Sequence, residues 1–136
     1  MYERPEAPHD GAAFDAAIAM VRAQHATLRS VAILTTRAGL STDAVLSLAD
    51  AVKVHEMDEA VVFETPFVTR TPRLVTTTAE RVQRYCSDYT TGRHVLPSRT
   101  ASAARFVDAL LVHIAAEEAW LERECAHRRE HMLTIA

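Results

Sequence analysis

The 136-residue sequence contains little glycine and proline, with three Gly and five Pro. Ala, Leu, Arg and Glu are plentiful, which favours helices over a strand-rich sandwich. The only two cysteines, Cys86 and Cys125, are too few to suggest a disulfide framework, and they suit a reducing cytoplasm. No apolar run approaches the length of a bilayer span, and no secretory segment follows the first residues. These absences predict a soluble, cytoplasmic, helical protein.

Strong charge of either sign is also absent. The formal net charge is -3, which gives no electrostatic reason to expect nucleic acid or an anionic membrane as a partner. About half of the residues are apolar (49%), so a chain of this length has enough material for one domain with a core of ordinary size.

Hydrophobic periodicity divides the chain into an arm and four helices. Residues 1–11, with two prolines and a glycine, read as an N-terminal arm, and the remaining residues, 12–136, as the helical domain. The helices are predicted to cover about 12–38, 41–65, 77–92 and 98–131. Short connections between four amphipathic helices predict an all-α, antiparallel up-and-down four-helix bundle.

Local signals place the ends of these helices. Gly39 is expected to end the first helix, and Ser41 or Thr42 to cap the second, which stops before Pro66. Thr77 and Glu80 form a T-x-x-E capping box, which predicts the start of the third helix.

Three of the four apolar stripes carry histidine, and two carry a glutamate four residues later. His25 lies in the first helix, His55 and Glu59 in the second, and His113 and Glu117 in the fourth. A spacing of four residues is about 6 Å along a helix and keeps both side chains on one face, so each pair can hold one cation.

In an antiparallel hairpin of the first two helices, His25 and His55 are expected at the same level along the helix axes. His25 precedes residue 40 by 15 residues and His55 follows it by 15. If the second helix ends near residue 65 and the third begins near residue 76, the level of His55 and Glu59 corresponds to residues 82–86 of the third helix. Tyr85 falls in this window, and Tyr89 lies one turn beyond it.

A histidine on an apolar stripe is ordinarily a hydrogen-bonded core residue, and His25 alone would carry no more weight than that. Two buried carboxylates at one level are different, because desolvation and repulsion make Glu59 and Glu117 require protons, partners or a cation. Carboxylates mixed with imidazoles suit iron, manganese or zinc better than calcium or copper(I). Two facing carboxylates could also bridge two ions.

The segments VHEMDEAVVFETP and VHIAAEEAWLE resemble the two H-x-x-x-E segments of the hemerythrin-like family, also called the HHE cation-binding domain. AQHATL resembles the segment that supplies its isolated histidine, and the likeness extends from residue 12 to about 125. The resemblance implies a four-helix bundle with a non-heme di-iron centre, bridged by carboxylates and an oxo or hydroxo group. Such proteins bind, sense or store oxygen, or handle peroxide, nitric oxide or iron.

Carried onto this chain, the resemblance makes His25, His55 and His113 iron ligands and Glu59 and Glu117 bridging ligands. The third helix departs from the family, which usually places two histidines there, four residues apart. This chain has YCSDY instead, so Tyr85 and Tyr89 occupy that spacing, either as phenolate ligands or as rings that fill the volume.

Other polar residues carry weaker signals. His94 is expected too near the last turn to reach the level of His113, and Cys86 to be a small buried apolar group. His127 and His131 have ligand spacing but lie beyond the site. Glu56, Asp58 and Glu122 are expected to face solvent. Glu118 is expected either to face solvent or to contact a metal-binding residue without binding the metal itself.

Two functions follow. The first is a cytoplasmic di-iron protein that binds or reacts with oxygen, peroxide or nitric oxide, with tyrosine in place of the third-helix histidines. The alternative is a bundle with one metal or none that acts as a sensor or protein-binding module. Whether the chain is an enzyme, and its oligomeric state, stay open at this point.

Overall fold

The computed structural model describes residues 11–63, 71–92 and 98–135, without the side chains of 11–13, 61–63, 128 and 131–135. Four α-helices make up almost all of this part: α1 (Gly11–Arg37), α2 (Thr42–Phe63), α3 (Arg73–Thr91) and α4 (Arg99–Ile135). The predicted all-α class is therefore confirmed for the described residues. The predicted arm lies outside them, except that Gly11 already begins α1. None of the described helices is both long and apolar enough to cross a membrane.

The helix ends follow the turn signals in four places. Gly39 adopts φ 70°, a left-handed conformation that glycine tolerates without strain, directly after α1. Gly92, with φ 74°, caps α3, and its N–H bonds to carbonyls of the last turn. Before α2 and α4, the hydroxyls of Ser41 and Ser98 accept hydrogen bonds from backbone N–H groups three residues later.

The predicted start of the third helix is wrong. α3 begins at Arg73, directly after Pro72, whose extended backbone (ψ 147°) precedes the first turn. Thr77 lies inside the helix, and its hydroxyl donates to the carbonyl of Arg73 instead of capping an N-terminus. Proline lacks an N–H group and suits a helix start, so Pro72 and not the T-x-x-E pattern sets this boundary.

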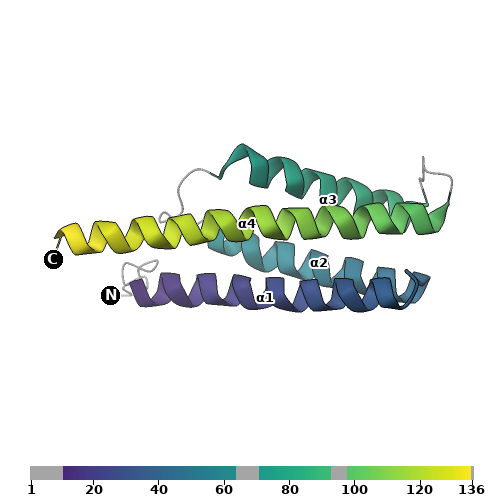
Figure 1. The fold of residues 1–136 in the computed structure, drawn as a ribbon, viewed down its shortest axis with the longest axis horizontal. Coiled ribbons are helices and arrows are strands. Elements are labelled where there is room, and N and C mark those ends of the chain that lie inside the picture. Colours follow the sequence, from purple (N-terminus) through teal and green to yellow (C-terminus); the bar gives the residue numbers. More distant parts are fainter. Residues whose placement is uncertain (1–10, 64–70, 93–97, 136) are drawn as a thin grey trace, which may run out of the picture.

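The helices pack as two close pairs, α1 with α2 and α3 with α4, and α1 also packs against α4 (Figure 1). Contacts between α3 and α4 join Thr78 to His113 near one end and Tyr89 to Arg99 near the other. Residue numbers thus rise along α3 as they fall along α4, so these two helices run in opposite directions. Figure 1 also shows the start of α1 and the end of α4 at the same end of the long axis.

The buried apolar residues form two separate clusters with a polar layer between them. The larger cluster, which includes Leu48 and Phe106, lies toward the α1–α2 connection. The smaller one contains Phe14, Ile18, Val21, Val75, Trp120 and Leu121. In α1, His25 falls between Val21 of the smaller cluster and Leu28 of the larger one, and in α4 Glu117 falls between Ile114 of the larger cluster and Trp120 of the smaller one. Both clusters therefore shield the polar layer from water.

The larger cluster predicts a large difference between two aliphatic substitutions in α4. Leu110→Ala removes a fully buried side chain and should lower the free energy of unfolding by about 2–5 kcal/mol. Val112→Ala, at a side chain that is 54% exposed, should change it by less than about 0.5 kcal/mol. Urea unfolding of the metal-free variants measures both values, and equal losses would contradict this assignment of the core.

Candidate metal centre

Four of the predicted donors converge at one level of the bundle. His25 comes from α1, His55 and Glu59 from α2, and Glu117 from α4, and one ligand atom of each lies within 4.8 Å of the others. All four are buried, and the side chains of His25 and Glu117 are fully so. The spacing of four residues in α2 acts as predicted, because His55 Nε2 lies 2.5 Å from Oε2 of Glu59.

Glu117 connects this group to the fifth predicted donor. Its Oε1 lies 2.8 Å from Nε2 of His25, and its Oε2 lies 3.0 Å from Nε2 of His113. His25 Nε2 also lies 3.6 Å from Oε2 of Glu59. Ligand atoms bound about 2.1 Å from one ion are about 3 Å apart, so most of these separations match those of a shared ion. The two oxygens of Glu117 face different histidines, as in a bridging carboxylate.

The convergence leaves polar atoms unsatisfied. Among the described residues, six buried side-chain atoms have no hydrogen-bond partner, and all belong to this cluster: Nδ1 and Nε2 of His25, Nε2 of His55, Oε2 of Glu59, and both carboxylate oxygens of Glu117. Buried polar groups without partners are costly, and native structures contain few of them. Apart from Nδ1 of His25, which faces Glu118, these nitrogen and oxygen atoms lie close together, and such a set fits a metal ion of the iron, manganese or zinc type.

Without metal, the same atoms form charged contacts. Burial alone would lower the pKa of His25, but the contacts with Glu117 and Glu59 outweigh it and raise this pKa from 6.5 to about 9. Burial would likewise raise the pKa of Glu117, but the contacts with His113 and His25 hold it well below its usual value. At neutral pH the metal-free centre therefore contains an imidazolium and a carboxylate, and a metal ion must displace the proton of His25.

Contacts outside the cluster orient the histidine rings. The hydroxyl of Thr78 lies 2.8 Å and 3.0 Å from the carbonyls of Leu74 and Val75, to which its single proton can be donated. Its oxygen can then accept a hydrogen bond from Nδ1 of His113, 2.9 Å away. The proton is thus fixed on Nδ1, which leaves Nε2 of His113 free to bind a metal.

Glu118 supports the fully buried histidine of α1 in a similar way. Its Oε1 lies 3.3 Å from Nδ1 of His25, although the angle is not that of a hydrogen bond. Its Oε2 accepts a hydrogen bond from Nε of Arg22 at 3.1 Å. From the sequence, Glu118 is expected to face solvent or to contact a metal ligand, and the structure places it in contact with His25.

The structure does not bring the two predicted tyrosine ligands into this cluster. The ring of Tyr85 lies under the guanidinium group of Arg105, 4.8 Å from its centroid, and packs against the larger apolar cluster. Tyr89 is buried within that apolar cluster, with Arg99 over its ring at 4.7 Å. From α3, Thr78 is the residue that contacts a predicted ligand.

The difference in height has a simple cause. α3 begins three residues earlier than the sequence pattern predicts, and the described part of α2 extends to Phe63, two residues short of the predicted end. The same pairing of helices then moves the expected level by five residues, from 82–86 to 77–81. This corrected window contains Thr78 and excludes Tyr85, which lies about 10 Å further along α3.

Sequence reasoning misses two residues that lie around the His/Glu cluster, Gln24 and Asp58. Asp58, expected to face solvent, is half-buried and accepts a hydrogen bond from Gln24. Both residues directly precede a cluster residue, and this position beside the buried stripe is the signal that could have found them. Cys86 is buried, as expected. His127 is exposed, whereas His94 and the side chain of His131 lie outside the described part of the chain.

Comparisons with protein families, with curated proteins and with solved structures find no match to this chain. Its class therefore rests on the fold and the site described above. The described residues form four helices with a buried cluster of histidine and glutamate that could hold a metal ion.

The pKa of His25 predicts how the stability of the metal-free protein depends on pH. Because this pKa is raised in the folded state, the charged contacts contribute fully below about pH 6.5, and this contribution is lost as the pH rises through about 9. The difference in free energy of unfolding between the wild type and His25→Gln should therefore shrink between pH 6 and pH 9.5. Urea unfolding with a chelator present measures it, and a constant or growing difference would contradict the assignment.

Proposed function

We propose that this chain is a non-heme iron protein of the hemerythrin-like kind, which presents a buried centre to oxygen, peroxide or nitric oxide. The observation that carries the proposal is the set of unsatisfied atoms on His25, His55, Glu59 and Glu117, other than Nδ1 of His25, which faces Glu118. An antiparallel up-and-down arrangement of the helices is part of the proposal, and the opposite directions of α3 and α4 support it. The order of the ligand motifs along the chain also supports the proposal.

The donors suggest two unequal metal positions. His25, His55, Glu59 and Oε1 of Glu117 would hold the first ion, with four donors from three helices. His113 and Oε2 of Glu117 would hold the second, and α3 offers it the hydroxyl of Thr78 behind His113 rather than a ligand of its own. A position with few protein ligands is open to water or a small oxidant.

Iron suits these residues because its ions accept imidazole and carboxylate together. When bound, iron would supply the redox chemistry and the open coordination positions. The chain itself supplies the orientation of the ligands and the exclusion of water, since an apolar cluster lies on each side of the polar layer. The two cysteines are free thiols, in keeping with the proposed location in a reducing cytoplasm.

A second candidate function is a sensor or binding module with one metal ion. The absence of a ligand from α3 at the corrected level favours it, because His113 and Glu117 are then the only clear donors of the second position among the described residues. The stoichiometry of metal binding distinguishes this candidate from the di-iron protein.

Metal content tests the proposal directly. Protein loaded anaerobically with iron(II) should hold about two ions per chain at saturation, and the second ion should be lost first on dialysis. Elemental analysis before and after dialysis measures both numbers. A single ion at saturation would favour the second candidate, and no bound ion would overturn both.

A matched pair of variants then locates the metal. Glu117→Gln should lower the metal content and abolish the rise in melting temperature on iron loading, because a ligand that binds the folded state stabilises it by mass action. Glu122→Gln changes an exposed glutamate of the same helix and should preserve both. If Glu117→Gln retains metal and thermal shift, the ion lies elsewhere.

The placement of Tyr85 predicts the optical spectrum. A phenolate ligand would give ferric protein a broad visible charge-transfer band, but the contact with Arg105 holds this ring outside the cluster. The ferric wild type should lack the band, and Tyr85→Phe should leave the spectrum unchanged. Loss of a visible band in Tyr85→Phe or Tyr89→Phe would show that a tyrosine does bind the metal.

A further inference from the structure

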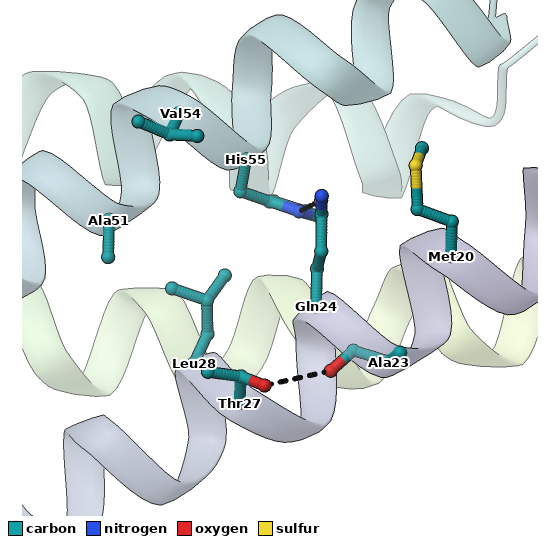
Figure 2. Close-up of a pocket in the computed structure, with 8 residues that line it drawn as sticks. All are labelled: Met20, Ala23, Gln24, Thr27, Leu28, Ala51, Val54 and His55. Atoms are coloured by element: carbon teal, nitrogen blue, oxygen red, sulfur yellow. Dashed lines mark hydrogen bonds between the residues drawn. The ribbon is translucent and has the colours of Figure 1, made fainter.

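Gln24 joins His55 to Asp58 across the contact between α1 and α2. Its Oε1 lies 2.6 Å from Nδ1 of His55, and its Nε2 donates a hydrogen bond to Oδ2 of Asp58 at 2.8 Å. Figure 2 shows the side chains of Gln24 and His55 pointing toward each other from the two helices. Both ends of one amide are thus engaged, one by a predicted ligand and one by a carboxylate.

The charge of Asp58 decides which way this amide points. An ionised carboxylate only accepts hydrogen bonds, so the NH₂ group of Gln24 must face it. The amide oxygen then faces His55, and an oxygen can only accept, so Nδ1 of His55 must carry a proton. Nε2 is left as the atom that can bind a metal, and it is the atom that faces Glu59.

We propose that Asp58 and Gln24 form a positioning relay, in which Asp58 orients the amide of Gln24 and Gln24 fixes the proton and the ring orientation of His55. This inference rests on the proposed metal-binding function of the cluster. It assigns to α1 and α2 the role that Thr78 has for His113, and partners of this kind raise metal affinity by holding a ligand in its binding geometry.

The surroundings of the relay exclude competing partners. A groove of about 450 Å³ opens beside Gln24 and His55, and its other lining residues carry aliphatic groups, the thioether of Met20 or a hydroxyl (Figure 2). That hydroxyl belongs to Thr27 and donates to the carbonyl of Ala23. Within the described part of the groove, Gln24 is therefore the side chain available to Nδ1 of His55, so its replacement should leave this nitrogen without a fixed partner.

Gln24→Met tests the relay, because methionine has nearly the same shape but no hydrogen-bonding amide. The control is Thr27→Val, which changes the same groove at a hydroxyl that donates to the carbonyl of Ala23. In ¹⁵N NMR of metal-free protein, the wild type and the control should show a slowly exchanging Nδ1–H resonance for His55, and Gln24→Met should lose it. For zinc(II), measured against a chromophoric chelator, Gln24→Met should bind about 10–100-fold more weakly than the control.

A charge exchange tests the direction of the relay. In Asp58→Lys, the ammonium group donates to the amide oxygen, so the NH₂ group of Gln24 turns toward His55 and disfavours a proton on Nδ1. Zinc affinity should fall about 10–100-fold in this variant. Adding Gln24→Glu should restore most of it, because a carboxylate accepts from both the lysine and His55. Circular dichroism checks that each variant remains helical.

Two results would overturn the relay. One is a Gln24→Met protein that keeps the Nδ1–H resonance and binds zinc within about twofold of Thr27→Val. The other is a double variant that binds zinc as weakly as Asp58→Lys alone. If the wild type binds no zinc or iron, the proposed function fails instead, and the resonance in metal-free protein still decides whether Gln24 fixes the proton of His55.

Discussion

The fully buried carboxylate of Glu117 is the constraint on which the rest of the centre depends. Each of its oxygens faces the Nε2 atom of a different histidine, His25 at 2.8 Å and His113 at 3.0 Å. A carboxylate so far from water needs positive charge beside it. In the metal-free protein His25 supplies that charge as a cation, and the proposed metal ions would supply it in the loaded protein. Either way, α1 and α4 are held together at this level.

The cluster of histidine and glutamate can be predicted from the sequence because the rules that it follows are local. Residues four apart on a helix share a face, and this spacing alone pairs His55 with Glu59 and His113 with Glu117. The first hairpin is nearly symmetric about residue 40, which sets His25 beside His55. The contacts between Nε2 atoms and carboxylates confirm that these five residues come together.

The contribution of α3 cannot be predicted in the same way. The residue of α3 that lies level with His55 and Glu59 depends on where α2 ends and where α3 begins. An error of five residues in these positions points to Tyr85 instead of Thr78. The residues around the cluster cannot be predicted for a different reason. Gln24 and Asp58 lie beside the buried stripe rather than on it, so periodicity does not place them in the core, although they are half-buried at a helix contact.

Crystallography of iron-loaded protein, with anomalous data collected at the iron edge, tests the central claim most directly. We expect a peak within coordination distance of Nε2 of His25, Nε2 of His55 and a carboxylate oxygen of Glu117, with a second, weaker peak beside His113. A peak at the exposed His127 with none in the bundle would contradict it, as would an iron-loaded crystal in which these nitrogen and oxygen atoms bond only to one another.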